Sequence, residues 1–238
     1  GILRRIYGKR IASPSRGWSV DRLLVLSDAM IAVSMTLLIA KIRLDFSSSE
    51  PLAVLAFILP QLWVYMLSFT IVALYWASHH RIFQFIKKED GRLVYLNFIF
   101  LFFIELLPIP NLLYANFGGQ PLAIIIYALA QFLMGLMILL IWLYASGRHR
   151  LIEQDLSRKE IRSQATRSSI PPLIFLLSSG VALIGPQYAL YFWLLVIVVQ
   201  GAYLRVKHGK LHAKDARDAA PMATLAGSTE DAAIWDNR

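Results

Sequence analysis

A membrane-length apolar run, residues 22–40 (RLLVLSDAMIAVSMTLLIA), places Ser27 and Asp28 among hydrophobic side chains and begins with Arg22. A helix needs about 20 such residues to cross the hydrocarbon core of a bilayer. A carboxylate at the centre of such a helix costs about 3 kcal/mol unless a partner or water meets it. The run therefore predicts a spanning helix whose Asp28 serves either a polar contact between helices or a water-filled path.

The composition agrees with a membrane protein. Hydrophobic residues make up 57% of the 238 residues and charged residues 16%, whereas a soluble domain carries about 25% charge. Because the chain has no cysteine, disulfides and thiolate chemistry are excluded.

Six apolar segments predict an all-α membrane protein with six transmembrane helices. They lie near residues 23–42, 52–79, 93–114, 121–146, 170–186 and 188–206. Gly185-Pro186-Gln187 separates the last two, because a glycine and proline together mark a turn. We expect a basic N-terminus at residues 1–21, a transmembrane domain at 22–206 and a polar tail at 207–238.

The orientation follows from the positions of Lys and Arg. With six spans, 22 of the 24 Lys and Arg fall on one side, and only Lys41 and Arg43 fall on the other. The positive-inside rule then places both termini of this multi-pass protein in the cytoplasm. The net charge of +9 is therefore a topology signal, and it does not indicate a nucleic-acid partner.

Polar residues of the first two helices meet at one depth in this topology. Asp28 lies six residues inside Arg22, about 9 Å along the axis, within reach of an arginine or an imidazole. We expect an inter-helix hydrogen-bond network among Arg22, Ser27, Asp28, Trp76, His79 and His80. Alternatively, Asp28 sits near the interface and the two histidines extend to water.

The other face of the first helix carries an apolar stripe. Val33, Thr36, Leu37 and Ala40 follow the i, i+3, i+4, i+7 spacing of one helix face. Such a stripe is typical of helix packing, but it also suits a narrow conduit that closes by dewetting where apolar rings touch. Thr36 would then be the one polar group offered to a passing ion. The spacing does not separate these interpretations.

The third helix contains Glu105 and Pro108. Because Pro108 has no N–H, the carbonyl of Ile104 loses its partner and the helix should kink. Glu105 would lie deep in the span. It is either part of a proton or cation relay, or a protonated carboxyl that bonds to the freed backbone.

Enzyme chemistry finds no support. The chain has no phosphate loop, dinucleotide fingerprint, zinc-protease motif or nucleophile elbow, and the adjacent His79 and His80 make a poor metal pair. We therefore expect no enzyme activity, no cofactor and no metal site. The alternatives are a proton-coupled membrane transporter that uses Asp28, Glu105 and His79, and a scaffold that conducts nothing.

Three motifs resemble one family. Arg22-x-x-x-Leu26-Ser27-Asp28 is similar to the R-x-x-x-F-S-D signature of the transmembrane protein 175 family, which comprises lysosomal potassium channels of animals and smaller bacterial relatives. The stretch from Ser68 to Arg81 resembles the second helix of that family. Asn97 with Leu106-Leu107-Pro108-x-Pro110 resembles its third helix. The resemblance covers roughly residues 20–206 and is strongest over 22–114.

The resemblance implies a channel domain at residues 22–206 in the bacterial inner membrane. Bacterial members form homotetramers in which the first helix of each subunit lines the pore. By position, the pore would be lined by Val33, Thr36, Leu37 and Ala40, with potassium transiently near Thr36. The same resemblance implies that the signature residues bind Trp76 and His79 or His80, and that the partners are copies of the chain, the bilayer and monovalent cations. Leu26 replaces the signature phenylalanine, and Ala40 and Lys41 depart from the usual outer pore residues.

Overall fold

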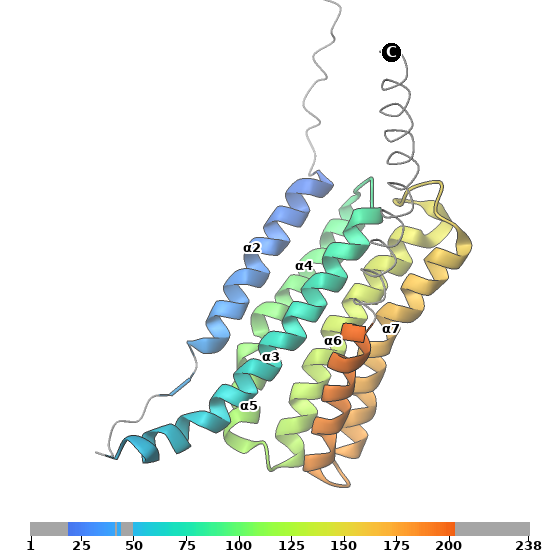
Figure 1. The fold of residues 1–238 in the computed structure, drawn as a ribbon. Helices are drawn as coiled ribbons and strands as arrows, with labels where there is room; N and C mark the ends of the chain where they lie inside the picture. The colour runs from blue at the N-terminus through green and yellow to red at the C-terminus, as the bar shows by residue number, and fades with distance from the viewer. Residues whose placement is uncertain (1–18, 41, 44–49, 203–238) are drawn as a thin grey trace, which may run out of the picture. The chain divides into compact units, whose positions relative to one another are not determined.

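The computed structural model describes residues 19–40, 42–43 and 50–202, and within these ranges the regular secondary structure is helical (Figure 1). The elements are α2 (Val20–Ile39), α3 (Pro51–Phe85), α4 (Gly91–Leu106), α5 (Pro108–Phe117), α6 (Pro121–Ser146), the short 3₁₀ helix η1 (Gly147–His149), α7 (Arg158–Val181) and a helix at Pro186–Ala202. The chain divides into two compact units, residues 1–193 and 194–238. The expected polar tail, most of the expected N-terminal segment and Lys41 lie outside the described residues.

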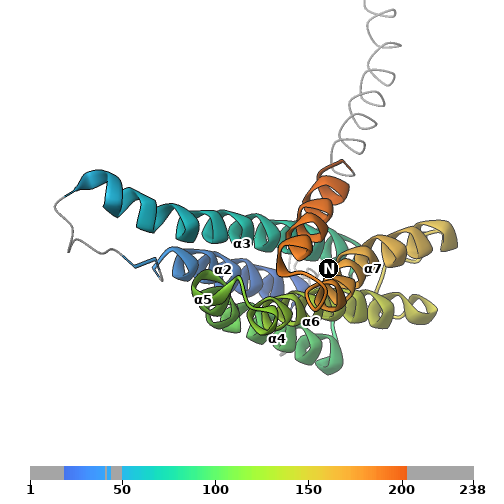
Figure 2. The ribbon, with the colours of Figure 1, turned by 90° about the horizontal axis from the view of Figure 1, so that it is seen from below.

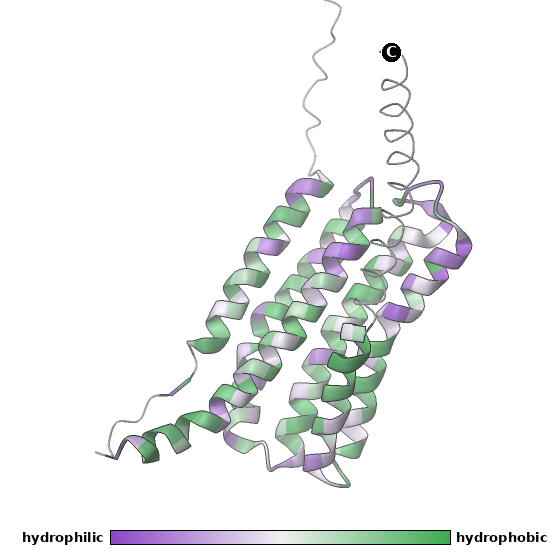
Figure 3. Ribbon diagram, viewed as in Figure 1, coloured by the Kyte–Doolittle hydropathy of each residue, from purple (hydrophilic) through white to green (hydrophobic). Residues whose placement is uncertain are grey.

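Four of the described helices are long and apolar enough to cross a membrane. They are Val20–Ile39, Pro51–Phe85, Gly91–Phe117 (α4 with α5) and Pro121–His149, which correspond to the first four predicted segments. Polar residues gather at the end of the bundle where α2 and α4 begin and along the first turns of α7 (Figure 3). The polar segments of the sequence are therefore grouped together in the folded chain, apart from the apolar parts of the helices.

The fifth predicted segment differs most from the structure. We expected a helix over 170–186, but α7 runs from Arg158 to Val181. Its first three turns are polar and are held by a capping box between Ser157 and Glu160, a local signal independent of hydropathy. The apolar pattern therefore detected only the second half of this helix, and α7 and Pro186–Ala202 are not among the four helices with spanning length and composition.

The expected break at Pro108 is present. α4 ends at Leu106 and α5 begins at Pro108, the first helical position, where proline is tolerated. The freed carbonyl of Ile104 accepts a bond from the N–H of Leu107 at 3.1 Å and from the Ser34 hydroxyl of α2 at 2.9 Å. A protonated Glu105 is therefore not what satisfies this carbonyl.

The loops after α3 and after α6 are bound to each other. Ile86 and Ile152 form an isolated antiparallel bridge, and the N–H of Lys87 donates to the carbonyl of Leu151 at 2.8 Å. These bonds join the segment that contains α2–α4 to the segment that contains α6 and α7.

Asp90 lies at this loop contact and caps α4. Its carboxylate accepts the N–H of Leu93 at 2.9 Å and the hydroxyl of Tyr144, and it lies 3.6 Å from the Arg150 guanidinium. Burial by itself would raise the pKa of Asp90, but the hydrogen bonds and the nearby Arg150 outweigh it and hold the pKa below its usual value.

We expect the contribution of Asp90 to stability to depend on pH. Because its pKa is depressed in the folded protein, the contribution is complete above the ordinary Asp pKa of about 3.9 and is lost as the pH falls through the lower folded value. Thermal unfolding of purified wild type and Asp90→Asn should differ most at neutral pH and converge on strong acidification. A difference that grew toward low pH would contradict this sign.

Candidate functional site

Helix α2 presents two different faces. One face is buried against α3 and α4, and Figures 1 and 2 both show α2 alongside these helices. The buried residues are Leu23, Ser27, Ile31, Ser34 and Leu38. The predicted stripe lies on another face and is exposed in a single subunit: Val33 is 55% and Leu37 39% accessible, and Thr36 and Ala40 are also exposed. The stripe is therefore not used for packing within the subunit.

Thr36 is the one polar side chain of this stripe. Its hydroxyl donates to the carbonyl of Ala32, one turn earlier, at 3.0 Å. Since that bond uses the hydroxyl proton, the oxygen lone pairs remain directed away from the helix backbone. A threonine held in this way offers an acceptor, and no donor, to whatever faces α2.

Two polar contacts bind α2 and α4 side by side. The amide nitrogen of Asn97 donates to Ser27 at 2.9 Å, and Ser34 donates to the carbonyl of Ile104 at 2.9 Å. Both pairs are separated by 70 residues in the chain, so α2 and α4 run parallel with one constant offset. The seven-residue spacing between the two contacts returns to the same face of each helix.

Asn97 also connects this pair of helices to α3. The Asn97 carbonyl oxygen lies 2.7 Å from Nε2 of His79, so Nε2 carries the proton and donates. Ser27 in turn donates to the carbonyl of Leu23 at 2.8 Å. The result is a directional chain of donors from His79 through Asn97 and Ser27 to the α2 backbone.

His79 lies in an aromatic environment. Its ring is fully buried and stacks on Phe83, with ring centroids 4.3 Å apart, and on Phe100, with centroids 5.0 Å apart. Its Nδ1 atom is buried and makes no hydrogen bond. His79 is thus held by one hydrogen bond and by stacking on two aromatic rings.

Asp28 has a separate partner. The indole N–H of Trp76 on α3 donates to Asp28 Oδ1 at 2.8 Å. Trp76 also stacks on His80, with ring centroids 5.7 Å apart. Of the two histidines left open by the sequence, His79 bonds within the helix interface, whereas His80 lies against the tryptophan.

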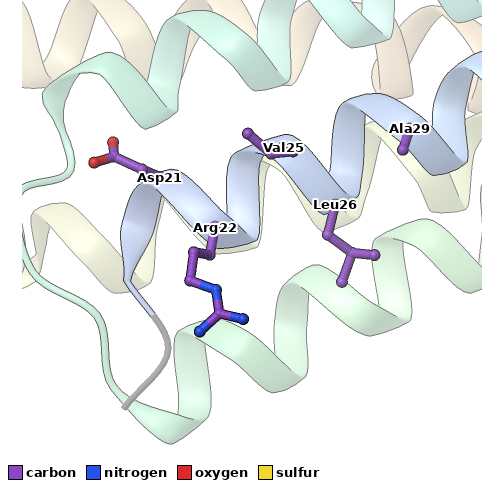
Figure 4. Close-up of a pocket in the computed structure, with 5 residues that line it drawn as sticks. All are labelled: Asp21, Arg22, Val25, Leu26 and Ala29. Carbon is purple, nitrogen blue, oxygen red and sulfur yellow. The ribbon is translucent and has the colours of Figure 1, made fainter. Parts of the chain in front are cut away.

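Arg22 lies apart from these contacts. Among the described residues its guanidinium makes no ion pair with Asp28. Asp21 and Arg22 point away from each other beside an open cavity of about 530 Å³ that is also lined by Val25, Leu26 and Ala29 (Figure 4). In a single subunit, the arginine of the motif therefore does not join the network expected for it.

Two residues of the interface were missing from the predicted site. Asn97 was noted only within the third-helix motif, although an amide inside the apolar run VYLNFIF signals a buried hydrogen-bond partner. Ser34 follows Ser27 by seven residues, and this spacing on an apolar helix was the available signal for a shared polar face.

Comparison with known proteins gives matches over this region. Residues 22–108, from Arg22 to the break at Pro108, match the family model described as endosomal/lysosomal potassium channel TMEM175. A potassium channel of Chryseobacterium sp. is 36% identical over 88 residues, which is 37% of this chain and 45% of that protein. A potassium channel of Chamaesiphon minutus is 25% identical over 170 residues, which is 68% of this chain and 84% of that protein.

Animal relatives are longer. The chicken endosomal/lysosomal proton channel TMEM175 is 32% identical over 144 residues, which is 58% of this chain. The chain spans 28% of the length of that protein and 45% of the Chryseobacterium channel.

The fold has solved counterparts. The crystal structure of a lysosomal potassium-selective channel TMEM175 homolog from Chamaesiphon minutus aligns with a TM-score of 0.68 at 19% identity, over 77% of this chain and 97% of that one. The family described by the matching model is one of ion channels, and this agrees with the expectation that the chain is not an enzyme. Residues 22–108 therefore match the TMEM175 family model, and the fold is similar to that of a solved TMEM175 homolog.

Proposed function

We propose that the chain forms a homotetrameric, potassium-preferring cation channel whose pore is lined by α2 of each subunit. The observation that carries the proposal is the exposed face of α2, where Val33 and Leu37 stay accessible while the opposite face is packed. An apolar helix face that the subunit leaves uncovered needs either lipid or copies of itself. The potassium channels named among the relatives favour copies around a conduit.

Conduction would be controlled by the apolar rings of this face. Four copies of Val33 and of Leu37 around an axis form a constriction that excludes water when the rings touch. Thr36 lies between them and offers an acceptor oxygen that a partly dehydrated potassium ion can use. The stripe has no charge and no carbonyl cage, so the preference for potassium over sodium would be weak.

The contacts of the opposite face would hold α2 in position. Trp76 binds Asp28, and Asn97 binds Ser27, so α2 is fixed to α3 and α4 near one end of the helix. These contacts would fix the rotation of α2 about its own axis, so that the Val33–Leu37 stripe faces outward from the subunit.

The membrane arrangement follows from the charges. We place both termini in the cytoplasm of a bacterial cell, with the protein in the inner membrane and α7 and Pro186–Ala202 completing six spans. The distribution of 22 of the 24 Lys and Arg on one side supports this orientation.

A proton-coupled transporter is the second candidate, since relatives are named proton channels and a coupled transporter would also move protons. It would need Asp28, His79 and Glu105 to exchange protons. Glu105 lies eight residues beyond Asn97 on α4, about 12 Å along the axis, and makes no hydrogen bond to the network in the described part of the chain. The geometry therefore favours the channel.

Two measurements test the channel. The purified protein in liposomes should pass potassium without a proton gradient, whereas a proton-coupled transporter should not. Because the chain has no cysteine, Val33→Cys introduces a single thiol, which should give oxidation-dependent dimers if α2 helices meet at an axis. Ile31→Cys, buried within the subunit, is the control. Cross-linking of Ile31→Cys alone, or no potassium flux, would overturn the proposal.

A further inference from the structure

We divide the described helices into the half at the level where α2 begins and the half farther from it. In the farther half, Glu105 is the one ionisable residue among Asp, Glu, Lys, Arg and His. After Asp28, the rest of α2 has no ionisable residue. α5 and α6 contain no Asp, Glu, Lys, Arg or His, and α3 contains none before His79. A carboxyl group isolated in this way inside a membrane is expensive and indicates a function.

The depth of Glu105 follows from the register of α2 and α4. Ser27 pairs with Asn97 and Ser34 with Ile104, both at an offset of 70 residues. At the same offset, Glu105 is level with Met35, between Ser34 and Thr36. Its carboxyl therefore lies at the depth of the Val33–Leu37 segment of α2.

The part of the subunit that the structure describes supplies no partner for this carboxyl. Glu105 is half-buried and makes no hydrogen bond or ion pair with any described residue. The nearby freed carbonyl of Ile104 is already satisfied by Ser34 and Leu107. Such a group is stable when it is protonated or when water reaches it, and a position beside a conduit allows both states.

We propose that Glu105 is a proton-binding site beside the constriction, and that loss of its charge on protonation lowers cation flux. The proposal rests on the channel function proposed above. An ionised carboxylate at this depth adds negative potential where a cation loses water, and protonation removes it. Wild-type potassium flux should then fall as the outer solution is acidified.

Few other groups compete in this titration. On the helices packed around α4, the titratable groups of the outer half are tyrosines: Tyr65 on α3, Tyr114 on α5 and Tyr127 on α6. On the outer loop the charged groups are Arg43 and Glu50, together with Lys41 and Asp45 outside the described residues. Tyrosine, arginine and lysine carry no carboxyl group, so they cannot account for a carboxylate charge that is lost on acidification. Glu50 and Asp45 are therefore the acidic groups to exclude.

The experiment compares Glu105→Gln with Glu50→Gln and Asp45→Asn in liposomes, with the outer pH varied. Wild-type flux should fall by about threefold from about pH 8 to about pH 4.5, as expected for loss of a screened charge near the path. Glu105→Gln should stay at the low-pH value throughout, and both controls should follow wild type. A pH response that survives in Glu105→Gln would overturn the proposal.

A spectroscopic measurement separates this proposal from the function on which it rests. Infrared difference spectra on acidification should show the C=O stretch of a newly protonated carboxyl in wild type, reduced in Glu105→Gln and retained in both controls. An unchanged band in Glu105→Gln shows that Glu105 binds no proton and overturns the proposal. If the band behaves as expected but wild type passes no potassium, the channel function and its control by Glu105 fail while the proton site stands.

Discussion

Leu37→Ala is expected to raise potassium flux in liposomes by about tenfold, which corresponds to about 1.4 kcal/mol of a conduction barrier. Leu37 is 39% accessible in the single subunit and lies on the exposed stripe of α2. Removing its branched end from four subunits widens the ring and lowers the cost of wetting it. Because the side chain is partly exposed in the single subunit, the fold should tolerate the change.

Ile39→Ala is the matched control for this prediction. Ile39 is 48% accessible and lies near the same end of α2, but 200° around the helix from Leu37. Its truncation should leave flux within about twofold of wild type, since it removes similar volume away from the expected axis. Equal flux in wild type and Leu37→Ala would show that this face does not limit conduction.

Asn97→Leu is expected to cost about 3 kcal/mol of stability, because it leaves the fully buried N–H of His79 without an acceptor and removes the contact with Ser27. For a chain of this size, that loss lowers the thermal midpoint by about 6 to 12 °C. The measurement is thermal unfolding of the detergent-purified protein. Asn116→Leu serves as control, since Asn116 is exposed and its amide bonds only to its own helix.

A double variant tests the cause. In Asn97→Leu combined with His79→Phe, both polar partners are replaced by apolar groups in a pocket lined by Phe83 and Phe100. Much of the stability should return, since no buried donor is left unpaired. If the double variant is less stable than Asn97→Leu alone, the loss arises from packing and not from the orphaned imidazole.

The positions of the spanning helices follow from local patterns. The lengths of the apolar segments predicted α2, α3, α4 with α5, and α6. A membrane-spanning helix satisfies its own backbone hydrogen bonds, so its position depends on segment length and hydropathy alone. The break at Pro108 was predictable for a similar reason, since a missing N–H acts on its own helix. The polar half of α7 was missed because a helix start held by a capping box leaves no hydropathy signal.

The sequence by itself determined the family match over residues 22–108, the helical class and the existence of a polar and an apolar stripe on one helix, because these depend on residue type and spacing. Only the tertiary structure decided which partner each polar group takes: Trp76 for Asp28, Asn97 between Ser27 and His79, and Ser34 for the carbonyl of Ile104. Periodicity states which side chains share a face, but several donors and acceptors lie within reach at each depth. The choice among them depends on the rotation and register of neighbouring helices, which packing alone sets.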